Sequence, residues 1–212
     1  PRFCARGYGG RSEVLDSMGD RYQLTVYDPA YQPPRWFGEG ITYNIFPDRF
    51  CRDREPVQPE GEGIAPRVLH ENWDDLPVYR PDEHGEILNN DFFGGTLRGV
   101  MEKLDYLESL HVQTIYFNPI FQAYSNQRYD TGDYKRIDPL LGSEEDFKTL
   151  CEQAKKRGMR VVLDGVFNHT GYDSRYFNGH GRYDSLGAHQ SKDSPYYPWF
   201  DFSEWPDKYG SW

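Results

Sequence analysis

The sequence predicts an α/β fold in which parallel strands alternate with helices. Three apolar runs, at residues 41–50, 114–121 and 161–168, have the composition of strands, and each leads into a polar or proline-containing break. Two amphipathic segments lie between them. A strand, a helix and a second parallel strand form a βαβ unit, so the chain should contain two such units, each with a right-handed crossover.

The two predicted helices are justified by their apolar spacing and their end signals. In the second helix, Ser143 is the expected N-cap, Asp146 completes a capping box and Gly158 is the expected stop. Apolar residues recur at intervals of three and four, so each helix has one face for a core. These residues are Leu97, Val100, Met101, Leu104, Leu107 and Leu110 in the first helix, and Phe147, Leu150, Cys151 and Ala154 in the second.

The third predicted strand runs into a cluster of polar groups. Residues 161–163 place apolar side chains on both faces, as in a parallel strand that is covered on both sides. Asp164, Asn168 and His169 follow at or just beyond its C-terminal end, where open α/β sheets and (β/α)8 barrels bind ligands. An Asp at a strand end often only fixes a turn, and a His there is often structural, so the upstream sequence has to decide between the two interpretations.

Several short segments match, in order, the signature segments of a known family. They are Ile45–Phe50 in the first strand, Phe92–Gly95 before the first helix, Tyr129–Tyr134 with Ile137–Pro139 before the second helix, and Asp164–His169 at the third strand. Together they resemble the alpha-amylase superfamily of glycoside hydrolases, most closely the neopullulanases, cyclomaltodextrinases and maltogenic amylases. The resemblance implies a partial (β/α)8 TIM barrel, namely its first three strand-helix repeats, with an irregular insertion after strand three.

The same resemblance implies four parts in the chain. Residues 1–28 would be the C-terminal remnant of a preceding β-sandwich domain, since residues 22–28 alternate like its final strand, and residues 29–40 would be a linker rich in Pro and Gly. Residues 41–168 would be the first part of the catalytic barrel, and residues 169–212 the start of a small domain inserted after strand three. A complete barrel needs roughly 250 residues, so we expect the chain to be a fragment of a longer enzyme.

By resemblance, that enzyme is a retaining hydrolase of α-glucans. It would cleave α-1,4 and also α-1,6 glucosidic bonds in maltooligosaccharides, cyclodextrins or pullulan. Retaining glycosidases use two carboxylates roughly 5 Å apart, one as nucleophile and one as general acid and base. In the family these two groups lie on strands four and five. We therefore expect both of them after Trp212, no catalytic residue in this chain, and no activity from the fragment alone.

What the chain retains, by the same resemblance, is part of the sugar pocket. Tyr129 matches an aromatic platform that stacks on a glucose ring, because an aromatic face suits the C–H face of a pyranose. His169 matches a histidine that bonds a hydroxyl of that sugar, and Asp130 is a further candidate for substrate binding. Asp164 and Asn168 would support these groups through hydrogen bonds. Without the family match, Tyr129 could equally be a loop aromatic packed on the barrel rim.

Two departures from the family pattern concern this pocket and a metal site. Gln127 stands where relatives usually have His, so one contact to the sugar would differ. Many relatives bind calcium beside the first strand, but here residues 51–55 include two arginines, and Thr96 stands where those relatives have Asp. Calcium prefers several oxygen ligands and is repelled by cations, so we expect no metal site in this chain. Whether the parent enzyme uses calcium or any other cofactor is left open.

Composition narrows the range of partners. Aromatic residues make up 17% of the chain, and its net charge of −10 disfavours polyanions such as nucleic acid. No apolar segment is long enough to cross a membrane. The expected partner is an α-glucan oligosaccharide. The oligomeric state of the parent, a homodimer being one option, and its location, cytoplasmic or secreted, are left open.

Two other functions fit parts of the sequence. A glycosidase-like domain that has lost catalysis could serve as a binding or scaffold module, although the presence of both Tyr129 and His169 favours an active parent. An unrelated α/β barrel enzyme that acts on a phosphorylated substrate would need a phosphate loop, and the sequence has no glycine-rich one. Carboxylates at the ends of strands four and five would decide in favour of a hydrolase or transglycosylase.

Overall fold

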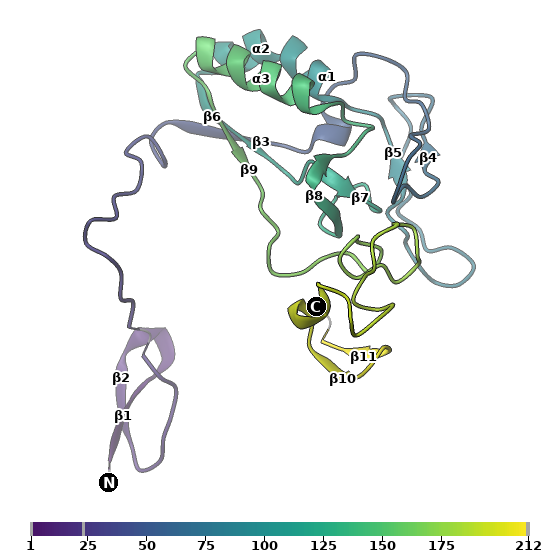
Figure 1. The fold of residues 1–212 in the computed structure, drawn as a ribbon. Helices are drawn as coiled ribbons and strands as arrows, with labels where there is room; N and C mark the ends of the chain where they lie inside the picture. The colour runs from purple at the N-terminus through teal and green to yellow at the C-terminus, as the bar shows by residue number, and fades with distance from the viewer. Residues whose placement is uncertain (1, 23, 211–212) are drawn as a thin grey trace. The chain divides into compact units, whose positions relative to one another are not determined.

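The structure is a computed structural model that describes residues 2–22 and 24–210. The chain divides into two compact units, residues 1–39 and 40–212. In the first unit, β1 (Phe3–Arg6) and β2 (Ser12–Leu15) form an antiparallel hairpin, with the 3-10 turn η1 (Tyr8–Gly10) between them (Figure 1).

The expected strand at residues 22–28 is not formed by residues 22 and 24–28, and Gln23 lies outside the described residues. In the described part of this unit, β1 and β2 pair with one another. Leu24 and Val26 are both 86% exposed, so the alternation in the sequence is not matched by a buried face. A strand needs a ladder partner and a covered face, and this segment has neither of them here.

Three parallel strands form the largest sheet among the described residues of the second unit (Figure 1). In spatial order they are β3 (Ile41–Ile45), β6 (Val112–Phe117) and β9 (Arg160–Leu163). The register pairs Ile45 with Phe117 and Phe117 with Leu163, which brings the C-terminal ends of all three strands to one edge. This confirms the predicted parallel arrangement.

The strands are shorter than the sequence predicts. β3 ends at Ile45, and Pro47 begins the 3-10 turn η2 (Pro47–Arg49), since proline has no N–H for a ladder. β9 ends at Leu163, and residues 164–169 are irregular. Residues 161–163 are half-buried rather than covered on both faces, because in the described part of the chain β9 has β6 on one side only.

Helices connect these strands. They are α1 (Leu97–Glu102) and α2 (Leu104–Ser109) between β3 and β6, and α3 (Glu144–Lys156) between β6 and β9. The ends of α3 confirm the predicted signals: Ser143 and Asp146 form the reciprocal capping box, and Gly158 has a φ of +75°, which favours glycine. The acidic first turn and the basic last turn of α3 also match its macrodipole.

The predicted single helix over residues 97–110 is interrupted. At Lys103 the backbone leaves the helical region, and its N–H donates to the carbonyl of Val100 at 3.0 Å, which is the tighter 3-10 pattern. Leu110 follows the last residue of α2 and is 38% exposed, so it does not belong to the core as predicted. The members of the apolar face that are fully buried are Leu97, Val100, Leu104 and Leu107.

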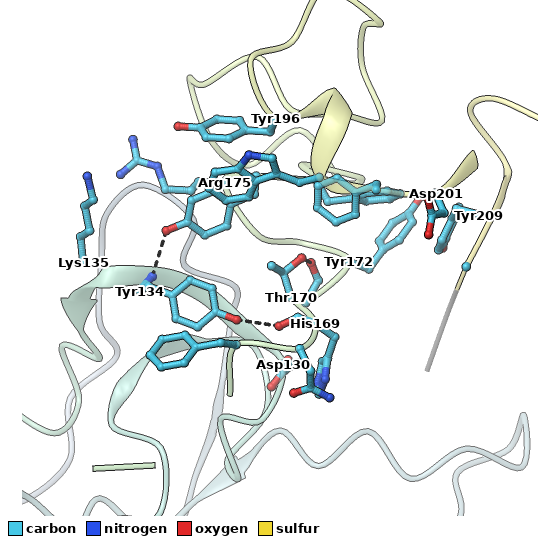
Figure 2. Close-up of a pocket in the computed structure, with 18 residues that line it drawn as sticks. Asp130, Tyr134, Lys135, His169, Thr170, Tyr172, Arg175, Tyr196, Asp201 and Tyr209 are labelled. Atoms are coloured by element: carbon cyan, nitrogen blue, oxygen red, sulfur yellow. Dashed lines mark hydrogen bonds between the residues drawn. The ribbon is translucent and has the colours of Figure 1, made fainter. Parts of the chain in front are cut away.

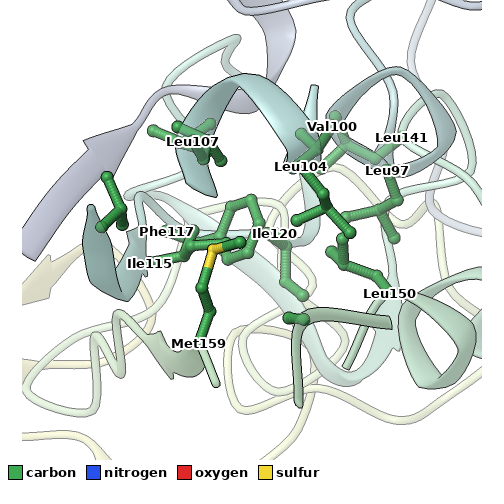
Figure 3. Packing of buried hydrophobic residues seen from close by; sticks show 13 residues of the cluster. Leu97, Val100, Leu104, Leu107, Ile115, Phe117, Ile120, Leu141, Leu150 and Met159 are labelled. Carbon is green, nitrogen blue, oxygen red and sulfur yellow. The ribbon is translucent and has the colours of Figure 1, made fainter. Parts of the chain in front are cut away.

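One hydrophobic cluster joins the sheet to the helices (Figure 3). Ile115 and Phe117 are two residues apart, so they point to the same face of β6. They share the cluster with Leu107 of α2 and Leu150 of α3, and Met159 contributes from the residue before β9. The helices are therefore fixed to the strands, and the sheet edge that carries the loops is held in place.

Long insertions follow each strand at its C-terminal end. After β3 comes a short parallel pair, β4 (Val68–Leu69) and β5 (Asp91–Phe92), and after β6 an antiparallel hairpin, β7 (Phe121–Ala123) and β8 (Thr131–Ile137). The insertion after β9 contains the 3-10 turn η3 (Tyr197–Trp199) and the short pair β10 (Phe202–Glu204) and β11 (Lys208–Tyr209). Loops at this edge are where α/β folds carry their sites.

Leu107→Ala should lower the free energy of unfolding by about 2–5 kcal/mol, because it removes a fully buried side chain and leaves a cavity. Leu110→Ala, three residues further on, should lower it by less than about 1 kcal/mol, since that side chain is already partly exposed. Urea unfolding followed by circular dichroism measures both changes. Equal losses in the two variants would contradict this assignment of the core.

Candidate functional site

Three of the candidate residues meet where the strands end. Tyr129 lies in the loop between β7 and β8, Asp164 directly follows β9, and His169 lies five residues further on. The backbone N–H of Asp164 donates to the carbonyl of Phe117, the last residue of β6, at 3.1 Å. This bond extends the parallel ladder by one step and sets the direction in which the Asp164 carboxylate leaves the sheet.

The Tyr129 hydroxyl donates a hydrogen bond to Oδ2 of Asp164, 3.0 Å away. Burial, together with the hydrogen bond to Asp164 and its negative charge, raises the pKa of Tyr129 to about 12. The phenol is therefore neutral and a donor at physiological pH. Tyr129 is 39% exposed, so its hydroxyl is anchored while part of the side chain remains accessible.

His169 contacts the backbone of the same tyrosine. Its Nε2 lies 3.0 Å from the carbonyl oxygen of Tyr129, and because a carbonyl only accepts, Nε2 carries the proton. The Tyr134 hydroxyl lies between the carbonyl oxygens of Val166 and His169, 2.6 Å from the latter (Figure 2). Tyr129 is thus held at two points, at its hydroxyl by Asp164 and at its carbonyl by His169.

Asp130 and Asn168 are placed differently. The Asp130 carboxylate accepts hydrogen bonds from the N–H and the hydroxyl of Ser125, so it closes the loop that carries Tyr129. Asn168 is exposed, and both Asn168 and Asp130 line the same cavity as His169. A role for Asp130 and Asn168 in binding or support remains a prediction.

A buried ion cluster lies behind this loop. Asp138, the residue after β8, is fully buried and accepts two hydrogen bonds from Arg67, at 2.7 and 2.6 Å. Arg128 is also fully buried and lies 3.3 Å from both oxygens of Asp138. Burial raises the pKa of Asp138, but the charges of Arg128 and Arg67 outweigh it and lower the pKa to about 2.

The aromatic ring of Phe92 completes the cluster. The guanidinium groups of Arg67 and Arg128 lie 4.5 and 5.3 Å from its centroid, which is within the range of cation–π attraction. The next residues, Phe93 and Gly94, donate their N–H groups to the buried carboxylate of Asp48. The cluster therefore connects the insertions after β3 and β6.

A cavity of about 1270 Å³ adjoins His169 (Figure 2). It lies between β8, the turn at residues 167–170 and the segment that follows, and its wall is rich in aromatic rings. Trp199 is 62% exposed and stacks on Tyr176, with ring centroids 5.4 Å apart. Lys135 and Arg175 add polar groups to this wall, so the cavity combines apolar faces with hydrogen-bond donors.

The residues beside β3 do not fit a calcium ion. The Asp53 carboxylate accepts a hydrogen bond of 2.6 Å from the Thr96 hydroxyl and lies 3.4 Å from the guanidinium of Arg54. Arg52 donates to the carbonyls of His70 and Glu71, so a second cation lies in this segment, where its charge would repel a metal ion. Across residues 2–22 and 24–210, no group of three or more His, Cys, Asp or Glu side chains is placed to hold a metal.

The match to a protein family decides what this chain is related to. The catalytic domain of alpha-amylase matches residues 44–211, a range that contains every candidate residue. This chain belongs to the alpha-amylase family. The match confirms the resemblance found in the sequence and gives the catalytic domain a TIM-barrel fold, and the three parallel strands with their crossover helices agree with part of such a barrel.

Relatives within the alpha-amylase family are longer than this chain. An amylopullulanase from Thermoanaerobacterium saccharolyticum is 40% identical over 213 residues, covering 96% of this chain and 16% of that protein. A cyclomaltodextrinase from Geobacillus thermopakistaniensis is 37% identical over 211 residues, covering 93% of this chain and 32% of that protein. The expected likeness to the cyclomaltodextrinase group is thereby confirmed.

A solved structure extends the comparison to a complex. It is a cyclic alpha-maltosyl-(1→6)-maltose hydrolase from Arthrobacter globiformis bound to maltose, 32% identical with a TM-score of 0.63. The likeness covers 82% of this chain and 34% of that one. All three of these proteins are named as α-glucan hydrolases.

No helix among the described residues is long and apolar enough to cross a membrane.

Sequence reasoning identified Tyr129, Asp164 and His169 as candidates, and the structure brings them into contact. It missed Arg67 and Arg128, since neither belongs to a periodic pattern. In the sequence, the cluster was indicated only by Asp138, which belongs to the family match at Ile137–Pro139 but was given no role. Arg67 and Asp138 are 71 residues apart in the sequence, so their pairing has no local signature.

The acid sensitivity of the chain should depend on Asp138. Its pKa is below the ordinary value of 3.8, so it contributes stability above about pH 4 that is lost as the pH falls toward 2, amounting to about 2 kcal/mol. Asp138→Asn should lower the free energy of unfolding at pH 7 by about 3–5 kcal/mol, because two buried guanidinium groups lose their carboxylate. It should also flatten the pH dependence between 4 and 2.

Urea unfolding at pH 7, 4, 3 and 2 measures these effects. Asp193→Asn is the matched control, since Asp193 is exposed and its loss should change stability by less than about 0.5 kcal/mol. An Asp138→Asn protein as stable as the control at pH 7 would contradict the role given to the ion cluster.

Proposed function

We propose that this chain is the first part of the catalytic barrel of a retaining α-glucan hydrolase, with three of its strands and the two helical crossovers between them, and that it supplies part of the glucose-binding pocket. The observation that carries the proposal is the contact of Tyr129 with both Asp164 and His169 at the C-terminal edge of the sheet. This is the edge at which barrel enzymes bind substrate. The proposed substrate is an α-glucan with α-1,4 and α-1,6 glucosidic bonds, such as a maltooligosaccharide, a cyclodextrin or pullulan.

In this proposal, Tyr129 provides the stacking surface for one glucose ring. Its hydroxyl is engaged by Asp164, which fixes the ring without using its faces. An aromatic face suits the apolar C–H face of a pyranose. Because the pKa of Tyr129 is raised to about 12, the phenol is protonated at physiological pH and remains a donor to Asp164.

His169 provides a hydrogen bond to a sugar hydroxyl. Its Nε2–H is directed to the Tyr129 carbonyl, so a hydroxyl that enters the pocket has to share that donor or replace the carbonyl as its acceptor. The hydrogen bond between Tyr134 and the His169 carbonyl keeps the backbone of His169 in place during such an exchange. Asn168 and Asp130 lie beside it and are proposed as secondary contacts.

Asp164 is proposed as a supporting residue and not as a nucleophile. A retaining mechanism needs a carboxylate free to attack the sugar and a second one roughly 5 Å away. The carboxylate of Asp164 is occupied by the Tyr129 hydroxyl, which makes it a hydrogen-bond anchor. The nucleophile and the general acid and base are proposed to lie on further strands of the enzyme, beyond Trp212.

The proposed domain organisation follows the family. Residues 1–28 belong to a preceding β-sandwich domain, residues 29–40 to a linker, residues 41–168 to the barrel and residues 169–212 to a small domain after strand three. The division at residues 39 and 40 supports a boundary at the end of the linker. The aromatic cavity beside His169 supports a role for the small domain in forming the wall of the substrate cleft.

In the full-length enzyme, Tyr129→Ala and His169→Ala should each lower kcat/KM for a maltooligosaccharide by about ten- to a hundredfold. The first loses the stacking surface and the second a hydrogen bond that tightens on the distorted sugar, each worth roughly 1–3 kcal/mol. Steady-state kinetics with maltotriose, with cyclodextrin as a second substrate, measures the change.

Tyr106→Ala is the matched control for these variants, because Tyr106 is an exposed tyrosine on α2, away from the site. It should leave kcat/KM unchanged. If Tyr129→Ala and His169→Ala folded normally and kept wild-type kinetics, the pocket assignment would be wrong. A full-length protein that binds maltose but turns over none of these glucans would instead be a scaffold module.

The 212-residue chain on its own should not hydrolyse maltooligosaccharides, cyclodextrins or pullulan. The reason is that its candidate residues bind and support the sugar, while the two catalytic carboxylates are assigned to other strands. Reducing-sugar release by the purified chain, compared with a buffer blank, measures this. Turnover above the blank would refute the placement of the catalytic groups.

A further inference from the structure

The loop that carries Tyr129 adopts an unusual backbone conformation. Arg128, the residue before Tyr129, has a φ of +61°, in the left-handed region that residues with a Cβ rarely adopt. Such conformations persist where the surrounding structure enforces them, and they are frequent at functional sites. The loop does not use a glycine at this position, so the side chain of Arg128 has to be part of the explanation.

That side chain is fully buried and runs back beneath its own loop. One guanidinium nitrogen of Arg128 donates to the carbonyl of Asn126 at 2.9 Å, and another lies 3.3 Å from Asp138. The first contact closes the loop on itself, and the second ties the loop to the base of the β7–β8 hairpin. Together these two contacts fix the backbone at residue 128, which determines the direction of Tyr129.

Arg128 is not the closest partner of Asp138. Arg67 already binds both oxygens of Asp138 at 2.7 and 2.6 Å, so the buried carboxylate has a close partner without it. A second buried guanidinium therefore carries a desolvation cost that is not needed to neutralise Asp138. What Arg128 provides in addition is geometry, because it is the member of the pair that lies in the loop.

We propose that Arg128 is a positioning residue, which fixes the backbone of the loop so that the ring and the carbonyl of Tyr129 meet Asp164 and His169 at the same time. This inference rests on the proposed function, since it concerns the same glucose pocket. Rotation of the backbone at residue 128 moves every following atom of the loop. It would displace the Tyr129 hydroxyl from Asp164 and the Tyr129 carbonyl from His169 together.

The far side of the loop is fixed independently. Asp130 accepts hydrogen bonds from Ser125, and the N–H of Arg128 donates to the Ser125 hydroxyl at 3.2 Å. Asp130 therefore keeps the loop closed, and Arg128 sets the direction in which the loop presents Tyr129. Loss of the Arg128 side chain should leave the loop closed but free to change its direction, so the pocket should be impaired in a variant that still folds.

The test uses Arg128→Lys and Arg128→Met in the full-length enzyme, each alone and combined with Tyr129→Ala. Lysine keeps the charge but loses the fork, and methionine loses both. Each single variant should lower kcat/KM for maltotriose at least tenfold. In the Tyr129→Ala background the same changes should have a clearly smaller effect, because the ring that meets Asp164 has been removed, while the backbone carbonyl that meets His169 remains.

Arg157→Lys is the matched control. Arg157 pairs with Asp105 at 2.7 Å on the helical face of the unit, so its replacement tests the loss of an arginine fork away from the pocket and should leave kcat/KM unchanged. Thermal melting is measured for every variant. If Arg128→Met does not fold, the double-mutant cycle of Arg128→Lys with Tyr129→Ala decides whether the proposal holds.

The proposal is overturned if Tyr129→Ala impairs the enzyme while both Arg128 variants keep wild-type kinetics. It is equally overturned if the Arg128 effect is the same size in both backgrounds, which indicates a general defect, or if neither Arg128 variant folds, which makes Arg128 a residue of the fold. A Tyr129→Ala enzyme with wild-type kinetics refutes the proposed function itself and is thus a separate outcome.

Discussion

The arrangement of the site depends on one buried carboxylate. Asp138 directly follows β8, and its two arginine partners come from different segments, Arg67 before β4 and Arg128 in the loop after β7. In a low-dielectric environment such a cluster is stable only when every charge has a partner at close range. The ion cluster therefore tolerates little change of geometry. Because Arg128 belongs both to the cluster and to the loop that carries Tyr129, the loop is held in one conformation as well.

The parallel register supplies the second requirement of the site. Because β3, β6 and β9 end at the same edge of the sheet, residues that are distant in the sequence lie close together there. The hydrophobic cluster beneath the helices holds that edge, and the ion cluster holds the loop above it. The apolar cluster thus holds the sheet edge, while the charged cluster holds the loop and also contributes to the stability of the unit.

Local signals were enough to predict the parallel strands and the caps of α3, because periodicity and capping act within a few residues. Tyr129, Asp164 and His169 were named through the family resemblance, and their role in binding a sugar stays a prediction. Local signals were not enough where long-range contacts decide. The turn at Lys103 interrupts an otherwise regular pattern, and residues 24–28, the described stretch around Val26, have neither a ladder partner nor a covered face. The pairing of Arg67 with Asp138 spans 71 residues and was invisible to pattern reasoning.

The contact between His169 and Tyr129 is made through the backbone of the tyrosine, whereas the contact with Asp164 is made through its side chain. The imidazole is therefore indifferent to the identity of the residue at this position, provided that the loop keeps its course. In the proposed glucose pocket, the ring of Tyr129 could therefore be exchanged for another surface while the histidine keeps its contact with the backbone. The two proposed contacts to the sugar would then vary separately, although they meet at a single residue.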